Sequence, residues 1–339
     1  MNTKELKQFK KELSRPRNIV IITHWSPDGD AIGSSLGFYH YLLQKKHKVT
    51  VITPNEYPSF LNWMKGNKQV IDFSADRPKA EKKLNQAELI FCLDFNSLKR
   101  IDALGPLVEQ SKALKLMVDH HPQPDAFADF EHHSVKACST AELIYTLIEL
   151  LGDHKLIDAT IGDCLYTGIM TDTGSFRYPS VTEETHRVVA ALIHAGANTS
   201  AIHERVYDNN TESRLRLLGF ALHEKMVLLP DYHAGYISLT EAELDHFGYQ
   251  KGDTEGLVNY ILSLRGMKFA TFIAERDGAV KMSFRSKGDF DVNSFARTHF
   301  GGGGHKNAAG GYSEKKLEEV IRQFRTILPT YLKELNKGK

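Results

Sequence analysis

The sequence predicts an α/β protein with an N-terminal doubly wound, mainly parallel sheet and a smaller, mixed α/β C-terminal domain across a cleft. In the first half, short apolar runs of strand length alternate with helical stretches, a pattern typical of parallel sheets covered on both faces. After about Met226 the pattern changes to alternating runs joined by turns. A chain of 339 residues is long enough for two such domains.

Four apolar runs in the first half have the length and β-branched content of buried strands. An amphipathic helix over about residues 4–14 precedes them, and another helix, roughly Ala31 to Gln44, follows the first run. The predicted strands are NIVIIT at 18–23, KVTVIT at 48–53, AELIFCLD at 87–94 and ALKLMVDH at 113–120.

Periodic apolar residues predict packed helices over 139–172 and 183–195. The stretch that follows is helical in parts and lacks sheet signals. We therefore assign residues 1–194 to the first domain, 195–222 to a helical connector and 223–337 to the second domain.

Hairpin patterns dominate the second domain. The segment MVLLPDYHAGYISL covers 226–239, and KFATFIAERDGAVKMSFRS at 268–286 contains Asp277-Gly278, a strong turn signal between two alternating runs. A final helix over about 314–328 is ended by Pro329.

Charge and cysteine content restrict the function classes. With 43 basic and 42 acidic residues the formal charge is +1, so the chain has no global field for long nucleic acid or an anionic membrane. Three cysteines without CxxC spacing predict reduced thiols and a cytoplasmic location. The charged N-terminus lacks a secretory apolar core, and no stretch reaches the ~18 apolar residues of a membrane span.

Metal-ligand side chains follow three predicted strands and one helix. Because ligands collect beyond the carboxyl ends of strands in doubly wound sheets, these side chains are expected to converge. Carboxylates and imidazoles together suit divalent ions such as manganese, and their number suits two ions ~3.5–4 Å apart with Asp94 as the bridge. The candidates are His24, Asp28 and Asp30; Asp94; Asp119, His120 and His121; and Asp172 at a helix end.

Taken singly, each of these segments has a simpler interpretation. His24 alone would be a hydrogen-bonded loop residue, and Asp28-Gly29-Asp30 a turn with a helix N-cap at Asp30. Their occurrence at successive strand ends favours the metal site. For other histidines, without companion acids, we expect surface or packing roles: His132, His133, His154, His203, His223, His233 and His246.

The second domain carries a candidate phosphate site. Arg285, Ser286 and Lys287 end a predicted strand, and a glycine run leads to His305. Bare backbone lets N–H groups approach an anion, and arginine adds bidentate donors. By itself the segment would be interpreted first as a flexible turn with a structural arginine; the predicted metal cluster favours the phosphate site. The substrate-binding candidates are Arg285, Ser286, Lys287, Gly302, Gly303, Gly304 and His305, with Arg265 as a weaker one.

In order along the chain, HWSPDGDAIGSSLG, CLDFN, VDHHP, TDTGSFRY, FRSKG and GGGGHKNAAGG resemble the DHH phosphoesterase superfamily over nearly the whole length. The similarity is to its stand-alone nano-RNase and pAp phosphatase branch, which carries a DHH-associated C-terminal domain. Family members more often have three glycines, His and Pro where this chain has four glycines, His305, Lys306 and Asn307.

The resemblance implies two Mn²⁺ ions, for which Mg²⁺ or Co²⁺ could substitute. The first would be held by His24, Asp28 and Asp94, and the second by Asp30, Asp94, His120 and Asp172. Asp94, His120, His121 and Asp119 form the predicted catalytic group, the last two orienting the ligands. Arg285, His305 and the glycine run would hold a terminal phosphate.

The predicted function is hydrolysis of RNAs of about two to five nucleotides to mononucleotides and of adenosine 3′,5′-bisphosphate (pAp) to AMP, by two-metal water activation. The predicted partners are short single-stranded RNA, dinucleotides and nucleoside bisphosphate, without long duplexes or membranes; a homodimer is compatible with the sequence. The alternatives are a cyclic-di-AMP or linear dinucleotide phosphodiesterase, a polyphosphate or pyrophosphate hydrolase, and a non-catalytic nucleotide-binding regulator.

Overall fold

A computed structural model describes residues 3–337 and confirms the α/β prediction. The chain divides between residues 209 and 210 into two compact units, each with its own sheet. The stretch 195–222, expected as a connector, is shared between them: helix α8 (Thr199–Tyr207) belongs to the first unit and α9 (Glu212–Glu224) to the second. Within residues 3–337 no helix is long and apolar enough to cross a membrane.

The first unit contains a six-stranded parallel sheet in the order β3-β2-β1-β4-β5-β6. All four predicted strands are present. The other two were not predicted, because β3 has only two residues and β6 ends in Glu-His-His instead of apolar residues. The bounds are β1 Asn18–Ile22, β2 Lys48–Thr53, β3 Ile71–Asp72, β4 Leu89–Leu93, β5 Leu114–Asp119 and β6 Phe130–His133.

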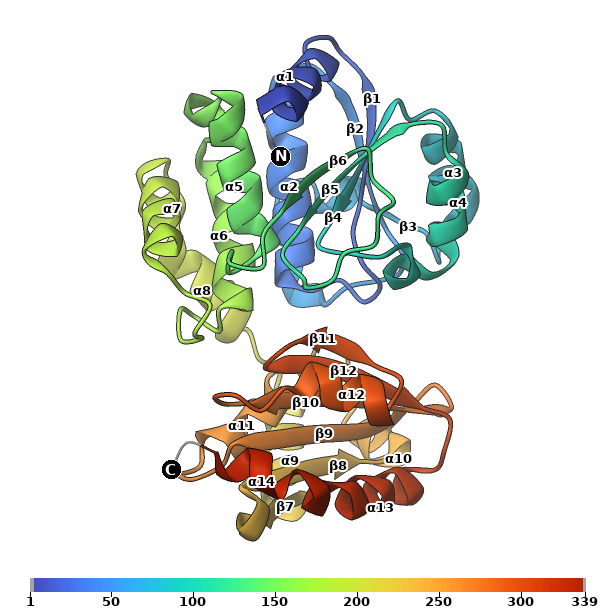
Figure 1. The fold of residues 1–339 in the computed structure, drawn as a ribbon, viewed down its shortest axis with the longest axis vertical. Coiled ribbons are helices and arrows are strands. Elements are labelled where there is room, and N and C mark those ends of the chain that lie inside the picture. The colour runs from blue at the N-terminus through green and yellow to red at the C-terminus, as the bar shows by residue number, and fades with distance from the viewer. Residues whose placement is uncertain (1–2, 338–339) are drawn as a thin grey trace. The chain divides into compact units, whose positions relative to one another are not determined.

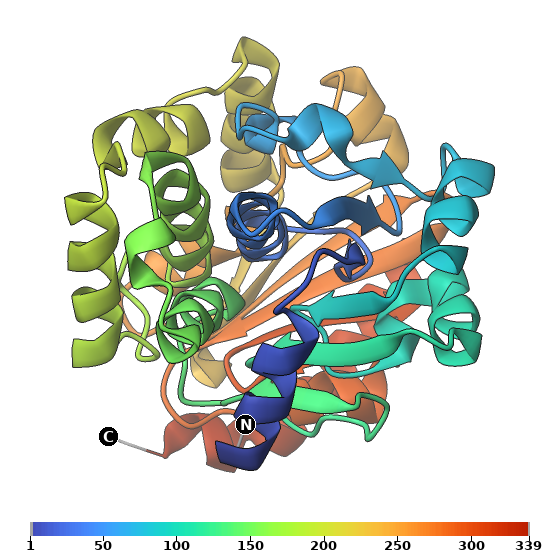
Figure 2. The ribbon, with the colours of Figure 1, turned by 90° about the horizontal axis from the view of Figure 1, so that it is seen from above.

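Helices cover both faces of this sheet, as Figures 1 and 2 show. Ile19 and Ile21 of β1 are buried in the core that also contains α1, α2, α5 and α6, whereas Val20 and Ile22 are buried in the core beneath α3 and α4. Successive side chains of one strand therefore serve opposite cores, so the run is apolar throughout. The helices are α1 Thr3–Glu12, α2 Gly29–Gln44, α3 Arg77–Asn85, α4 Gly105–Gln110, α5 Thr140–Leu151, α6 Ala159–Asp172 and α7 Glu183–His194.

The strand order reverses between β1 and β4. The chain leaves β1 for α2 on one face of the sheet and leaves β4 for the 3₁₀ segment η3 (Leu98–Leu104) and α4 on the other. A crevice therefore opens at the carboxyl ends of β1 and β4, which is where doubly wound proteins bind ligands.

Glycines spaced four residues apart bring α2 and α6 together. Gly33 lies so close to α6 that an added Cβ would stand 2.5 Å from the carbonyl oxygen of Cys164 and 2.8 Å from the amide nitrogen of Gly168. Gly29 faces Thr171 in the same way, with its added Cβ 2.3 Å from the Thr171 hydroxyl. This close contact carries Asp172, the last residue of α6, to the start of α2.

The second unit contains a mixed six-stranded sheet in the order β11-β12-β10-β9-β8-β7. Only β8 and β9 run parallel; the other neighbours are antiparallel. The strands are β7 Met226–Leu229, β8 Ala234–Leu239, β9 Phe269–Arg276, β10 Ala279–Ser286, β11 Gly303–His305 and β12 Ala308–Ser313. The remaining helices are α10 Glu241–His246, α11 Leu257–Ser263, α12 Val292–His299, α13 Leu317–Ile327 and α14 Leu332–Asn336.

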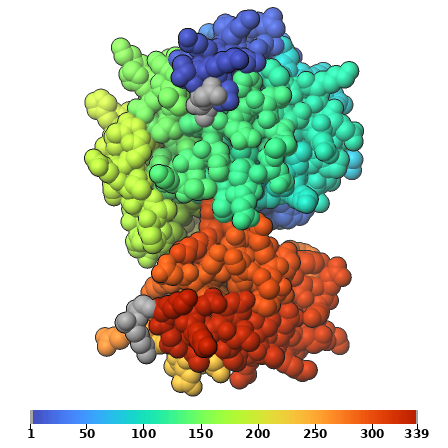
Figure 3. All heavy atoms as spheres, viewed as in Figure 1, coloured from blue at the N-terminus to red at the C-terminus, as the bar shows by residue number. Residues whose placement is uncertain are grey.

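Turn chemistry and helix placement follow the sequence in this unit. The β9–β10 hairpin turns at Asp277 and Gly278, both with positive φ (55° and 74°), as the Asp-Gly pair predicted. One core lies beneath α12, α13 and α14, and another contains α9, α10 and α11. In the space-filling view α13 and α14 (red) form much of the visible surface of this unit (Figure 3).

Candidate metal centre

The loop after β1 presents two ligand side chains. The helix N-cap is Asp28 instead of Asp30: Asp28 Oδ1 accepts hydrogen bonds from the amides of Asp30 and Ala31, each at 3.0 Å. His24 Nδ1 is 2.8 Å from the carbonyl oxygen of Trp25, to which it donates. This bond leaves His24 Nε2 as the atom that can bind a metal.

His24, Asp28 and Asp94 form a first cluster, with potential ligand atoms within 4.8 Å of one another. His24 Nε2 is 3.3 Å from Asp94 Oδ2 and 3.9 Å from Asp28 Oδ1. Burial alone would lower the pKa of His24, but the hydrogen bonds to Asp28 and Asp94 outweigh it and raise the pKa to about 10. The ring therefore occupies a strongly negative environment.

Asp94 lies directly after β4 in a left-handed conformation with φ 66°. Its amide donates to the carbonyl of Val118 at 3.0 Å, which continues the β4–β5 ladder and holds the residue in place. Only one oxygen, Oδ2, approaches His24; the other, Oδ1, is 3.6 Å from His120 Nε2. Asp94 thus presents one oxygen to each of two imidazoles.

The second cluster contains Asp30, His120 and Asp172. His120 Nε2 is 3.5 Å from Asp172 Oδ2, 3.6 Å from Asp94 Oδ1 and 3.9 Å from Asp30 Oδ2. Burial opposes protonation of His120, yet Asp172 and Asp94 raise its pKa. The structure therefore collects side chains from the ends of β1, β4, β5 and α6 in one place.

Helix α5 holds two of these carboxylates. The amides of Thr140 and Ala141, at its N-terminus, donate to the two oxygens of Asp30 at 2.6 and 2.8 Å. The hydroxyl of Thr140 donates to Asp94 Oδ1 at 2.9 Å. A helix N-terminus favours anions, so α5 offsets part of the repulsion between the two acids. The sequence analysis did not identify Thr140, although its position after the N-cap Ser139 was a usable signal.

Asp119 and His121 form a supporting pair at the end of β5. His121 Nδ1 is 2.8 Å from Asp119 Oδ1 and 3.7 Å from Asp94 Oδ1, and the His121 amide donates to Asp119 Oδ2 at 3.0 Å. Burial and the neighbouring Asp94 raise the pKa of Asp119 to about 6. Asp119 therefore fixes the orientation of His121 from a fully buried position.

Arg100 is a further cation near the centre that the sequence analysis missed. Its positive charge contributes to the pKa values of His24, Asp28 and Asp119. Its carbonyl accepts a hydrogen bond from the Trp25 amide at 2.7 Å, which ties η3 to the loop after β1. Arg100 stands six positions after Asp94 in a polar stretch, where sequence alone gives no reason to connect it with the acids.

The donor set fits divalent ions. It consists of carboxylate oxygens and imidazole nitrogens, without thiolates, which suits hard to borderline metals. Asp30 is buried beside other acids; burial, Asp94 and Asp172 raise its pKa well above the ordinary value. A bound cation would relieve this repulsion, so the arrangement is costly without one.

In the second unit, Arg285 and His305 share one row of the sheet. Arg285 pairs with Ala308 of β12, and Ala308 pairs with His305 of β11. Paired residues project from the same face, so both side chains lie on one face, separated by a small alanine. Both are partly exposed.

Two neighbours of Arg285 are engaged in local structure. The hydroxyl of Ser286 donates to the carbonyl of Phe290 at 2.6 Å and accepts from the side-chain amide of Asn307 at 2.8 Å. The ammonium of Lys287 contacts the carbonyl of Leu262. Arg265 is exposed in the turn before β9, the end of the sheet at which β10 finishes.

The glycine run forms part of a hairpin. An added Cβ on Gly302 would stand 1.8 Å from the carbonyl oxygen of Gly310, and one on Gly304 would stand 2.4 Å from that of Ala308. The amide of Gly304 already donates to Asn293 Oδ1 at 3.0 Å, and an added Cβ on Gly303 would meet that same oxygen at 3.4 Å. The absence of side chains here permits the close approach of β11 and β12. This approach places His305 opposite Ala308, in line with Arg285.

The family models that match this chain cover two separate domains, one in each of the two compact units. The DHH family N-terminal domain matches residues 18–169, and the DHHA1 domain matches residues 232–334. A bifunctional oligoribonuclease and PAP phosphatase NrnA from Thermus thermophilus is 32% identical over 94% of this chain and 91% of its own length. The chain belongs to the DHH family.

Two further proteins resemble this DHH family member over most of their length. The NrnA protein of the same description from Bacillus subtilis is 28% identical over 91% of this chain and 94% of its own. The crystal structure of an exopolyphosphatase-related protein from Bacteroides fragilis has a TM-score of 0.94 and 40% identity, covering 99% of this chain and 98% of that one. As a DHH phosphoesterase, the chain is a hydrolase.

Other polar features of this DHH protein lie outside these clusters. His132 Nε2 is 3.1 Å from the Thr146 hydroxyl, and His133 Nε2 donates to the carbonyl of His121 at 2.7 Å, which supports the loop after β5.

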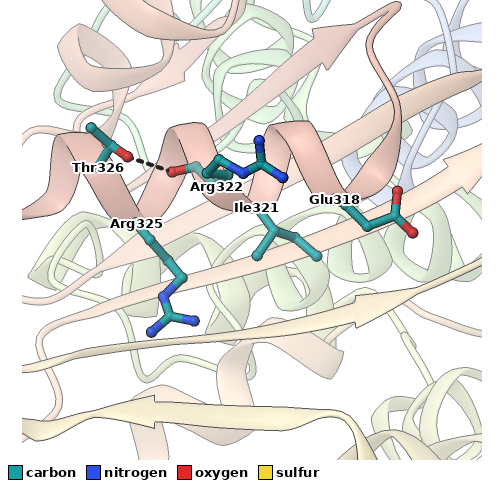
Figure 4. Close-up of a pocket in the computed structure, with 5 residues that line it drawn as sticks. All are labelled: Glu318, Ile321, Arg322, Arg325 and Thr326. Atoms are coloured by element: carbon teal, nitrogen blue, oxygen red, sulfur yellow. Dashed lines mark hydrogen bonds between the residues drawn. The ribbon is translucent and has the colours of Figure 1, made fainter.

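A shallow hollow of about 360 Å³ on α13 is lined by Glu318, Ile321, Arg322, Arg325 and Thr326 (Figure 4). Because all its side chains come from one exposed helix, it carries no catalytic assignment.

Proposed function

We propose that this DHH protein hydrolyses short oligoribonucleotides, of about two to five nucleotides, to mononucleotides and converts pAp to AMP with two manganese ions. The observation that carries the proposal is the position of Asp94, which directs one oxygen toward His24 and the other toward His120. A carboxylate placed in this way suits a pair of ions.

Each proposed ion has its own protein ligands. His24, Asp28 and Asp94 would hold the first, and Asp30, Asp94, His120 and Asp172 the second. When bound, the two ions would supply Lewis acidity that activates water and stabilises charge on the phosphoryl oxygens. Manganese suits this mixture of oxygen and nitrogen donors, and magnesium or cobalt would be substitutes.

The protein's own groups keep this arrangement in place. The Trp25 carbonyl fixes the tautomer of His24, and Asp119 orients His121. Thr140 and the N-terminus of α5 hold the side chains of Asp94 and Asp30 in position through hydrogen bonds. Arg100 adds a positive charge that would favour an anionic substrate near the acids.

The second unit would bind the substrate's phosphate through Arg285 and His305. Arginine offers paired donors to phosphate oxygens, and a partly exposed imidazole adds one more. Lys287 and Arg265 add positive charge at the same end of the sheet. We assign Ser286 and Gly302 to Gly304 to holding the local backbone on which Arg285 and His305 stand.

Preference for short strands is consistent with the overall charge. A formal net charge of +1 provides no extended basic track, and long single strands bind along such tracks.

The test compares rates under one manganese condition on pAp, an RNA dinucleotide, a five-mer, a 24-mer, cyclic-di-AMP and pyrophosphate. We expect fast release of mononucleotides from the dinucleotide and five-mer, conversion of pAp, and slow hydrolysis of the 24-mer. Preferred hydrolysis of cyclic-di-AMP or pyrophosphate would replace the proposed substrate class. Absence of hydrolysis on every substrate, with nucleotide binding retained, would indicate a non-catalytic regulator.

A further inference from the structure

A pocket of about 240 Å³ lies beside the first metal cluster, within the first unit. Its lining comes from loops that follow β1, β2 and β3 and from η3 after β4. It therefore opens at the same carboxyl edge of the sheet as His24 and Asp94, on the β1 to β3 side of the crevice.

Two aromatic side chains and one guanidinium are among the residues that line this pocket. Trp25 follows His24 directly and leaves 47% of its side chain exposed. Phe73 is nearly buried, and the Arg77 guanidinium lies over its ring, 5.4 Å from the centroid. The buried Ile101 and the exposed polar residues Ser74 and Asp102 also line it.

Two hydrogen bonds made by its backbone amide and carbonyl hold Trp25 in position. Its amide donates to the carbonyl of Arg100 and its carbonyl accepts from His24 Nδ1. An exposed indole beside the candidate metal centre offers a flat apolar face on which a planar ligand can stack.

We infer that this pocket binds the nucleobase of the nucleotide whose phosphate is held at the metal centre, with Trp25 as the stacking surface. The inference rests on the proposed function and adds a base subsite to it. An exposed indole and an exposed guanidinium are groups on which unpaired bases stack, and such stacking tolerates all four bases. Phe73, covered by the guanidinium of Arg77, supports that side chain from below. Ser74 and Asp102 offer hydrogen-bonding groups to base edges.

Fluorescence tests the pocket without catalysis. The chain has two tryptophans, so Trp63→Phe leaves Trp25 as the only indole. Trp63 lies elsewhere, beneath the Arg205 guanidinium at 4.8 Å, and phenylalanine keeps an aromatic ring there. In magnesium, which does not quench fluorescence, AMP should quench Trp25 saturably, whereas ribose 5-phosphate should not. Equal effects of the two ligands, or no saturable quenching by AMP, would overturn the inference.

Kinetics provide the second test. Trp25→Ala should raise KM for an RNA dinucleotide about ten-fold with little change in kcat, and Trp25→Phe should restore most of the loss, because a phenyl ring also stacks. A dinucleotide lacking the base next to the scissile phosphate should show no difference between wild type and Trp25→Ala. Trp63→Phe is the control and should keep the wild-type KM.

The outcomes separate this inference from the proposed function. Quenching by AMP without RNA hydrolysis by the wild-type protein would retain the pocket and reject the ribonuclease proposal. RNA hydrolysis with a wild-type KM in Trp25→Ala would retain the enzyme and reject the pocket. A loss in kcat alone would assign Trp25 to the placement of His24 and would also reject the pocket.

Discussion

Asp94 shows how one residue can organise the whole centre. Its left-handed backbone, φ 66°, points the carboxylate away from the strand and between His24 and His120. Non-glycine residues adopt this region rarely, and aspartate and asparagine are enriched there because their short polar side chains tolerate it. The strained residue therefore stands at the site where it is used.

Replacing Asp94 by asparagine should abolish metal-dependent turnover while sparing the fold. Asparagine accepts the left-handed backbone and the hydrogen bond from Thr140, but it removes the negative charge that the two proposed ions would share. We expect turnover to fall by more than about 100-fold. Loss of a residue that only hydrogen-bonds to a metal ligand typically costs about 10- to 100-fold, and loss of a ligand itself should cost more. Calorimetry with manganese should show a lower stoichiometry.

The exposed Asp231→Asn provides a matched control for this substitution. Its turnover and metal stoichiometry should equal those of the wild type. Unchanged turnover in Asp94→Asn would reject the bridging role, and loss of the folded circular dichroism spectrum would show that Asp94 is required for the fold instead.

Protonation at the centre predicts that metal affinity rises with pH. Without an ion, hydrogen bonds to Asp28 and Asp94 outweigh burial and hold the pKa of His24 at about 10, so a metal must displace a proton from this ring at neutral pH. The apparent Kd for manganese should therefore decrease steadily from about pH 6 to pH 8. Titration calorimetry in buffers of different ionisation enthalpy should detect proton release.

In the metal-free protein, the folding stability that His24 contributes should fall as the pH rises, whereas the metal affinity rises with pH. A histidine whose pKa is raised on folding contributes stability that is fully present below about pH 6.5 and is lost as the pH rises through about 10. Thermal unfolding measured across this pH range, once with chelator and once with manganese, separates the pH dependence of the metal-free fold from that of metal binding. A metal affinity independent of pH would exclude His24 as a ligand.

At the scale of elements, the contact between α2 and α6 decides where Asp172 lies. Gly29 and Gly33 leave the face of α2 without side chains, so the backbones approach closely and the end of α6 meets the start of α2. The sequence GDAIGSSLG shows the spacing, but the partner helix cannot be identified from spacing alone.

Gly33→Ala should weaken both the fold and the metal centre. Its Cβ would meet backbone atoms of α6 at 2.5 and 2.8 Å, and backbone cannot rotate away as a flexible side chain can. Overpacking typically costs about 1–3 kcal/mol, so Tm should fall by about 3–8 °C. Manganese affinity should fall as well, because Asp172 moves with α6.

Gly219→Ala is the matched control in an exposed position of α9. An added Cβ there meets nothing within 4 Å, so the better helix propensity of alanine should leave Tm unchanged or raise it slightly. A similar Tm for Gly33→Ala and the wild type would show that α2 and α6 can separate without cost.

At the scale of the whole molecule, the two units carry different parts of the proposed chemistry. The proposed metal ligands lie between His24 and Asp172, whereas the proposed phosphate-binding residues Arg285 and His305 lie in the second unit. Metal binding and phosphate binding should therefore respond to different substitutions.

Arg285→Ala should raise KM for a 5′-phosphorylated RNA dinucleotide about ten-fold or more, since a hydrogen-bonded charge pair with phosphate is lost. It should harm hydrolysis of a simple chromogenic phosphodiester much less and leave manganese affinity unchanged. Arg322→Ala, on the exposed face of α13, is the control and should change none of these quantities. Equal losses on both substrates in Arg285→Ala would contradict the phosphate-binding role.

Much of this organisation is visible in the sequence. Apolar runs such as NIVIIT specify buried strands because every side chain in them meets a core, and acids directly after such runs indicate a site at the carboxyl edge. The hairpin at Asp277-Gly278 follows from local turn preferences. Strands β3 and β6 were not predictable, since their pairing comes from neighbours and not from their own residues.

The sequence by itself determined the chemistry of the ligands, the succession along the chain of the strands that carry them and the change of architecture between the halves. Only the tertiary structure decided that Asp94 lies between two histidines, that Thr140 and Arg100 join the centre, and that Trp25 and Phe73 line the same pocket. The physical reason is that residue type and local period are properties of a segment, whereas proximity depends on strand order, register and helix contact. Those are settled when distant segments pack together.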